Sequence, residues 1–104
     1  MTCLKNKQGI NKITMMPVAY TKCVIGQDWY RNELEIIFIP ADVYPDYMEV
    51  NEWIMKEIDG EELNIEDVVA MIYDFLVDEY HPVSVEVKDH IRGCKTHFDV
   101  IVEK

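Results

Sequence analysis

The clearest pattern in the sequence is a helical period over residues 64–80. Apolar side chains recur there at steps of three and four residues and share one helix face, while acids occupy the other. Asn64 is a preferred N-cap, and Glu66 and Asp67 follow where the positive end of the helix dipole favours carboxylates. Helix electrostatics alone is therefore enough to explain Glu66. A role of Glu66 in binding a ligand has to be supported by the rest of the sequence. The apolar positions are Ile65, Val68, Val69, Ile72, Phe75, Leu76 and Tyr80.

Alternating and β-branched stretches predict four strands and a second, shorter helix. Pro17 interrupts the first strand and belongs at a sheet edge or strand start. Residues 1–12 read as a flexible polar arm, and residues 13–104 as one domain. The predicted strands are 13–25, 33–39, 83–88 and 95–102, the helix is 49–58, and the connecting segments are 26–28, 41–46 and 89–93.

The order ββααββ predicts an α+β fold, with a four-stranded antiparallel sheet and both helices on one face. Such a sheet exposes its edges, and we expect copies of the chain to join there as a homo-oligomer.

The acidic composition of the chain limits the kinds of molecule that its surface can bind. Twenty acidic residues against ten basic ones give a formal charge of −10, so we expect the monomer surface to repel nucleic acid and anionic membranes. Neither a membrane-spanning run nor a signal peptide is expected, because the apolar runs are short. Three cysteines without framework spacing fit a reducing cytoplasm, which leaves a thiolate available for chemistry.

The short motifs resemble those of the 7-cyano-7-deazaguanine reductase family (QueF-type), which has the tunnelling fold and the same element order. The family signature Cys-Pro-Val-Thr-Gly-Gln-Pro-Asp is similar to residues 23–28, Cys-Val-Ile-Gly-Gln-Asp, which precede a strand. Its Val-Glu-Leu-Lys-Ser-Leu-Lys-Leu-Tyr segment resembles residues 48–56, and its Phe-His-Glu-Asp-Val-Val pattern resembles residues 64–69. An Arg-Gly-Gly turn before the last strand resembles residues 92–94. Four weak motifs in the same order are together moderately specific.

The resemblance implies covalent chemistry on a nitrile. Cys23 would be the nucleophile that forms a thioimide, Asp28 the acid and base, and Glu66 the anchor of the deazaguanine, with Glu49 as a further substrate contact. A thiolate is nucleophilic enough for a nitrile, a carboxyl group can move the proton that the imide nitrogen needs, and a carboxylate can accept two N–H bonds.

The resemblance further implies NADPH, with Arg92 and Gly93 as candidate cofactor contacts, and reduction of the nitrile to the 7-aminomethyl base of the queuosine pathway. The alternative is non-redox addition of ammonia to give an amidine, as in archaeosine synthesis. Asn51 and Ile54 at the family's lysine positions favour the amidine, whereas the acidic charge disfavours a tRNA-linked substrate. On balance we expect reduction of the free base.

Two further readings stay open, and a metal site is not expected. The chain could be a catalytically silent tunnelling-fold module that binds a purine or pterin, or a pterin-pathway cyclohydrolase or aldolase. A metal would have to use His90, Cys94 and His97. In a strand Cys94 and His97 would point to opposite faces, and the chain has no CxxC or HExxH spacing.

Overall fold

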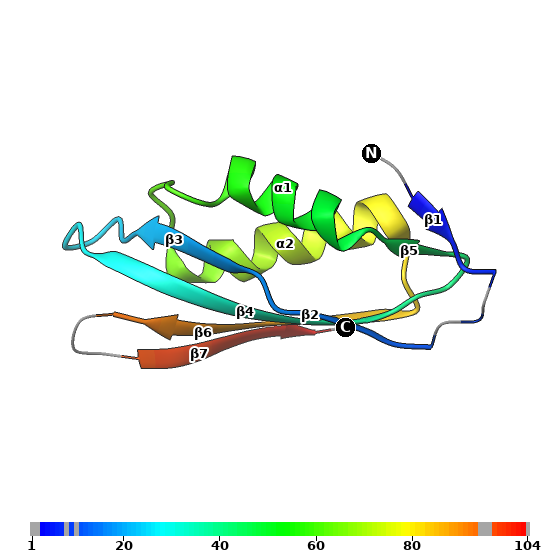
Figure 1. Ribbon diagram of the computed structural model, residues 1–104. Coiled ribbons are helices and arrows are strands. Elements are labelled where there is room, and N and C mark those ends of the chain that lie inside the picture. The colour runs from blue at the N-terminus through cyan, green and yellow to red at the C-terminus, as the bar shows by residue number, and fades with distance from the viewer. Residues whose placement is uncertain (1–2, 8, 10, 94–96, 104) are drawn as a thin grey trace.

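The computed structural model describes residues 3–7, 9, 11–93 and 97–103. It contains an antiparallel sheet with both helices packed on one face (Figure 1). A small separate pair of strands lies near the N-terminus. The elements are β1 (Cys3–Lys5), β2 (Ile13–Met15), β3 (Val18–Lys22), β4 (Trp29–Ile39), β5 (Val43–Pro45), α1 (Tyr47–Glu57), α2 (Ile65–Tyr80), β6 (Ser84–Arg92) and β7 (His97–Glu103).

Strand β4 is the strand on which the rest of the sheet is built. β2 and β3 pair one after the other with the two halves of β4, β6 pairs along its opposite side, and β7 lies outside β6. The predicted strand 13–25 is thus broken at Met16 and Pro17, because Pro17 has no N–H to donate to the ladder. The carbonyl of Pro17 still accepts the Leu34 N–H at 3.0 Å. The predicted α+β arrangement is confirmed, with its first strand in two pieces.

The strands differ from their predicted bounds in three places. Residues 3–5 of the predicted arm pair as β1 with β5, inside the predicted loop 41–46, through a contact between distant segments. β4 begins at Trp29 rather than at residue 33. The predicted turn at 89–93 is wrong, because β6 runs on to Arg92 with its alternation of buried and half-buried side chains intact. Because Asp89 is charged, the sequence predicted that the strand ends before it. In the fold, however, the Asp89 side chain is fully buried.

The core lies between the helices and the side chains that the sheet directs toward them. Along β4 and β6 alternate residues are buried, and α2 supplies the apolar face expected from its period. Polar side chains are also buried here: the Asn32 amide donates to the Ala19 carbonyl at 3.1 Å and to the Thr21 hydroxyl at 2.9 Å. The largest fully buried side chains are Tyr80, Phe38, Met15, Leu34, Ile36, Ile54, Ile58, Ile72, Leu76 and Ile91.

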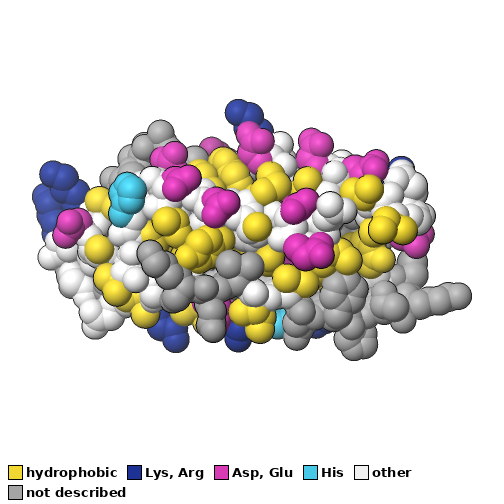
Figure 2. Space-filling view, turned by 180° about the vertical axis from the view of Figure 1, so that it is seen from behind, with side chains coloured by type: hydrophobic (Ala, Val, Ile, Leu, Met, Phe, Trp, Pro, Cys, Tyr) yellow, Lys and Arg dark blue, Asp and Glu magenta, His cyan; other side chains and the backbone are white. Residues whose placement is uncertain are grey.

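The negative charge of the chain is concentrated in the helical layer. Residues 47–80 hold eleven of the twenty acids and one base, Lys56, so this segment carries a formal charge of −10 and the remainder is neutral. Figure 2 shows acidic side chains spread over the part of the surface where the helices lie, with apolar side chains between them. Neither helix described here is long and apolar enough to cross a membrane. The charge of the whole chain is therefore a property of one face.

Candidate active site at the end of strand β3

Cys23 lies at the start of a tight turn between β3 and β4. Its backbone N–H donates to the carbonyl of Asp28 at 2.8 Å, which closes the turn. Two consecutive residues have left-handed backbone conformations, Gly26 with φ of 83° and Gln27 with φ of 59°. The Cys23 side chain is half-buried and Asp28 is exposed. A carboxylate oxygen of Asp28 lies 3.8 Å from where a Cβ on Gly26 would be, so this carboxylate lies over the turn.

The connection between the helices, residues 58–64, lies along the free edge of β3. Three backbone hydrogen bonds attach the two segments, and an isolated parallel bridge joins Lys22 to Glu62. The connection thus supplies the partners that a further strand would otherwise give to this edge. The bonds run from Gly60 N to Tyr20 O (2.7 Å), from Lys22 N to Glu61 O (2.9 Å) and from Leu63 N to Lys22 O (3.1 Å).

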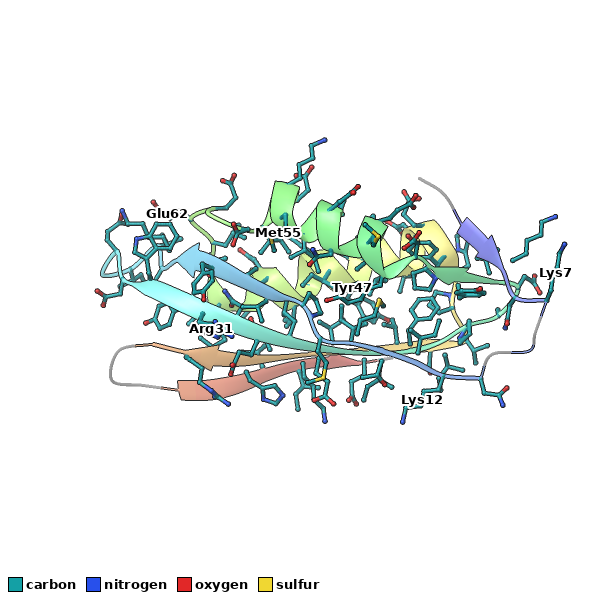
Figure 3. The ribbon with its side chains drawn as sticks, in the orientation of Figure 1. Lys7, Lys12, Arg31, Tyr47, Met55 and Glu62 are labelled. Atoms are coloured by element: carbon teal, nitrogen blue, oxygen red, sulfur yellow. The ribbon has the colours of Figure 1, made fainter. Side chains whose placement is uncertain are left out.

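This docking brings the start of α2 to the end of β3, which Cys23 follows. Leu63 is bonded to Lys22, the neighbour of Cys23, and Glu66 follows Leu63 by three residues in the exposed first turn of α2. Figure 1 shows the end of β3 and the start of α2 at the same end of the molecule, where Glu62 is labelled in Figure 3. Cys23, Asp28 and Glu66 are therefore gathered at one end, by contacts between segments about forty positions apart in sequence.

Gln27 and Glu62 complete this end of the molecule, and sequence reasoning gave neither a role. The Gln27 amide donates at 3.1 Å both to the Val24 carbonyl within the turn and to the Glu62 carboxylate in the helix connection. The only signal in the sequence was the place of Gln27 inside the Gly-Gln-Asp motif. No sequence pattern pointed to Glu62, because its partner lies 35 residues away.

Glu49 lies elsewhere. It belongs to the first turn of α1, eight residues before the helix ends, or about 12 Å along the axis from the connection at 1.5 Å per residue. It lines a groove of about 280 Å³ with Glu52, Trp53 and Lys56. The Trp53 ring stacks on Phe75, with the ring centres 4.2 Å apart. The structure therefore separates Glu49 from the other predicted substrate contacts.

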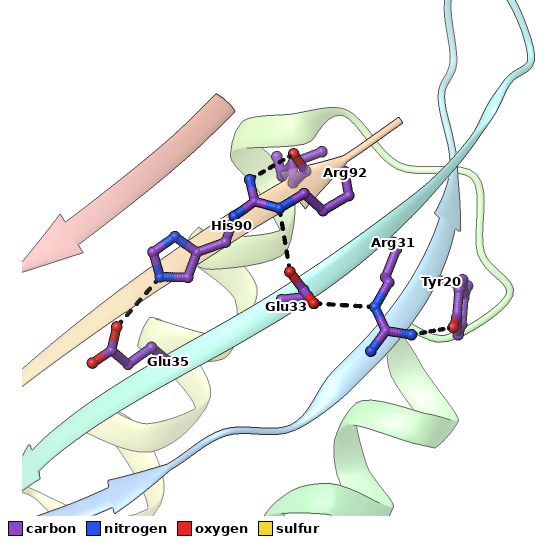
Figure 4. A network of polar contacts seen from close by, with 7 residues as sticks. Tyr20, Arg31, Glu33, Glu35, His90 and Arg92 are labelled. Atoms are coloured by element: carbon purple, nitrogen blue, oxygen red, sulfur yellow. Dashed lines mark hydrogen bonds and ion pairs between the residues drawn. The ribbon is translucent and has the colours of Figure 1, made fainter. Parts of the chain in front are cut away.

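Arg92 lies on the face of the sheet that points away from the helices, at the end of β6, and Gly93 follows it. Glu33 accepts from two arginines there: its two carboxylate oxygens lie 3.3 Å from Arg92 Nε and from Arg31 Nε (Figure 4). The hydrogen bond to Glu33, and a second one to the Tyr20 hydroxyl at 2.5 Å, raise the pKa of the Arg31 guanidinium above its usual value.

A pocket of about 310 Å³ opens beside this network, at the break between β2 and β3. Arg92, Glu33 and His90 line it, together with residues 16–18 and 34. His90 in turn lies 3.3 Å from Glu35 (Figure 4). Arg92, one of the two predicted cofactor contacts, thus belongs to the outer face of the sheet, and Gly93 follows it beyond the end of β6.

Comparison with known proteins identifies a solved structure that has the same fold. No protein-family model matches the chain, and no curated protein sequence matches it. The crystal structure of the archaeosine synthase QueF-Like in its apo form superposes with a TM-score of 0.80, covering 91% of this chain and 94% of that one at 14% sequence identity. The chain has the fold of QueF-Like. This agreement confirms the tunnelling fold inferred from the motifs.

At this level of identity the likeness to QueF-Like concerns the fold, and the roles of individual residues are predictions. Among the residues that the structure describes, no three His, Cys, Asp or Glu side chains gather as a metal site. Cys94 and the His97 side chain, considered above as ligands, lie outside the described part of the chain.

Proposed function

We propose that this chain is an enzyme that captures the nitrile of 7-cyano-7-deazaguanine as a thioimide on Cys23. The observation that carries the proposal is the hydrogen bonding of the helix connection to β3, which supports a site at the end of the molecule where the Glu66 turn and the cysteine turn both lie. A nucleophile and a base anchor from distant segments then meet at one end of the molecule, in a fold shared with an archaeosine synthase.

The first step uses three side chains. The Cys23 thiolate adds to the nitrile carbon, one π bond of the nitrile opens, and the nitrogen takes a proton from the Asp28 carboxyl group to give the thioimide. The Glu66 carboxylate accepts N–H bonds from the guanine-like edge of the base. Holding the base and the thiolate in a fixed relation makes the addition effectively intramolecular.

For the second step we propose addition of ammonia rather than reduction, which departs from the expectation based on sequence alone. Ammonium gives a proton to the Asp28 carboxylate that the first step leaves, the resulting ammonia adds to the thioimide carbon, and Cys23 leaves as the thiolate, so that the product is released as a protonated amidine. Acids crowd the proposed site, because Asp59, Glu61, Glu62, Glu66 and Asp67 all lie in or beside the helix connection. Negative potential attracts ammonium and repels the phosphates of NADPH and of a polynucleotide, so the favoured substrates are the free base and ammonium.

Reduction by NADPH is the second candidate, and one observation favours it. Arg92 and His90 line the outer-face pocket, and Arg31 is ion-paired with Glu33 beside it; such cations suit the phosphates of a dinucleotide. In this reading two hydride equivalents from NADPH would convert the thioimide to the aminomethyl base through an imine.

The test is to incubate the protein with 7-cyano-7-deazaguanine and to record its intact mass. We expect a covalent adduct that is absent in Cys23→Ser and retained in Cys3→Ala and Cys94→Ala, which remove the other two cysteines. Adding ammonium salt or NADPH to the adduct, and identifying the released base, then distinguishes the two reactions. Binding of the base without any adduct would instead identify a catalytically silent module.

We also propose that copies of the chain associate through sheet edges. The edge of β3 is occupied by the helix connection, whereas within the described residues β2 and β7 each pair with one neighbouring strand. Those two edges can accept a further strand. Light scattering on the purified protein measures the mass of the assembly, and a monomer at micromolar concentration would contradict the proposal.

A further inference from the structure

Gln27 occupies an unusual position for its residue type. Its φ of 59° lies in the left-handed region, where residues other than glycine, asparagine and aspartate are uncommon. Such a conformation persists where surrounding contacts determine it. Here one side-chain amide bridges the Val24 carbonyl and the Glu62 carboxylate, both at 3.1 Å.

We propose that Gln27 and Glu62 form a positioning pair that fixes the cysteine turn relative to the Glu66 turn. The inference rests on the proposed function, because it assigns the pair to the geometry of thioimide formation. The bond links the two segments directly: Gln27 lies in the turn that Cys23 begins, and Glu62 lies four residues before Glu66. Neither side chain is placed in contact with the reacting atoms.

The pair is separable from the attachment of the helix connection to β3. Backbone bonds between Lys22 and both Glu61 and Leu63 hold the connection to the strand, and a side-chain substitution leaves these bonds in place. Loss of the Gln27–Glu62 bond therefore frees the turn while the connection stays attached. We expect loss of the Gln27–Glu62 bond to lower the rate of thioimide formation more than it lowers the affinity for the base or the stability of the fold.

The experiment measures thioimide formation from 7-cyano-7-deazaguanine by rapid mixing and intact mass, together with the equilibrium affinity for the base. Glu62→Ala removes the acceptor, and Glu62→Gln keeps a carbonyl oxygen in its place. Gln27→Asn keeps an amide and tolerates the left-handed backbone, but it is too short to span to Glu62. Glu61→Ala is the matched control, because it removes the same charge one residue away.

At saturating base we expect Glu62→Ala and Gln27→Asn to form the adduct on the order of tenfold more slowly, since small misplacements of reacting groups carry large rate penalties. Affinity for the base should change by less than about twofold, because the anchor is untouched. Glu62→Gln and Glu61→Ala should form the adduct as fast as the unmodified protein, because this step involves no ammonium, and combining Gln27→Asn with Glu62→Ala should be no slower than either alone.

Three outcomes overturn the inference, and they can be told apart. If the unmodified protein forms the adduct and Glu62→Ala forms it equally fast, the positioning pair is refuted while the proposed function stands. If the unmodified protein forms no adduct, the proposed function and the pair are both refuted. A loss of affinity and rate together, shared by Glu61→Ala, would assign the effect to charge and also refute the pair.

Discussion

Asn32 is the residue whose replacement should most clearly weaken the strand that carries the cysteine. Its side chain is 1% exposed and donates two hydrogen bonds to β3, to the Ala19 carbonyl and to the hydroxyl of the buried Thr21. In Asn32→Ala both bonds are lost, at a net cost of about 1 kcal/mol each. The cavity left by the amide adds about 1 kcal/mol. We therefore expect the free energy of unfolding to fall by about 3 kcal/mol in total.

Urea denaturation followed by tryptophan fluorescence measures this change, because Trp29 begins β4 and Trp53 packs in the helical layer. A loss of 3 kcal/mol corresponds to a fall in melting temperature on the order of 12–20 °C for a domain of this size. Thr21→Val, which removes one acceptor and keeps the shape, should cost about 1–2 kcal/mol. Thr14→Val is the matched control on an exposed strand position and should be close to neutral. A loss below about 1 kcal/mol in Asn32→Ala would refute the reasoning.

Two further predictions concern the ends of the helices. The Asp46 carboxylate caps α1 by accepting the Met48 N–H at 2.9 Å, whereas Asn64 at the start of α2 makes no side-chain capping bond. Asp46→Ala should therefore lower the free energy of unfolding by about 1 kcal/mol, and Asn64→Ala should lower it by clearly less. Chemical denaturation measures both changes. Equal costs for the two would contradict this assignment. His81 ends α2 with φ of 45°, so His81→Gly should stabilise the fold by about 0.5–1 kcal/mol while His81→Ala should not, as read from thermal unfolding. A destabilised glycine variant would show that the His81 side chain contributes more than its backbone strain costs.

Periodicity was sufficient to predict the helices and the order of the strands in the main sheet, but it did not predict β1 and β5. The predicted helix 64–80 differs by one residue from α2, and the predicted helix 49–58 overlaps α1 in all but its ends. These elements depend on local signals, such as the apolar spacing and the break at residues 81–82. The end of β6 was missed because Asp89, a polar residue in sequence, is fully buried in the fold.

The candidate site was predictable only in part, because its geometry depends on contacts between distant segments. The motifs selected Cys23, Asp28 and Glu66, which the fold places at one end, and also Glu49, which lines a groove along α1. Nothing in the order of residues indicates that the helix connection bonds to the edge of β3. The Gln27–Glu62 bond and the two arginines around Glu33 likewise depend on the register of strands and loops.

The location of the charge changes what the value of −10 implies about the reaction. Averaged over the chain it argues only against polyanions, but five of the acids lie in or beside the helix connection, where they favour a small cation such as ammonium. A unit charge roughly 10 Å from the reacting carbon contributes about 0.4 kcal/mol in water before screening. With a Debye length of about 30 Å at 10 mM salt and about 8 Å at physiological salt, roughly 0.3 and 0.1 kcal/mol remain.

Neutralising two acids near the connection, Glu61→Gln with Asp67→Asn, should therefore lower the amidine rate at subsaturating ammonium about threefold at 10 mM salt and about 1.5-fold at physiological salt. The same change of charge farther along α2, Asp74→Asn with Asp78→Asn, is the control and should have a smaller effect, because these residues lie about 10–16 Å farther along the axis than Asp67. The measurement is the release of amidine from the preformed adduct as a function of ammonium and salt. An unchanged rate in the first pair of variants, or a rate that rises with added salt, would show that the acids do not attract ammonium. The proposal of amidine formation would then lose its electrostatic support. Reduction by NADPH at the arginine-lined face would become the favoured reaction.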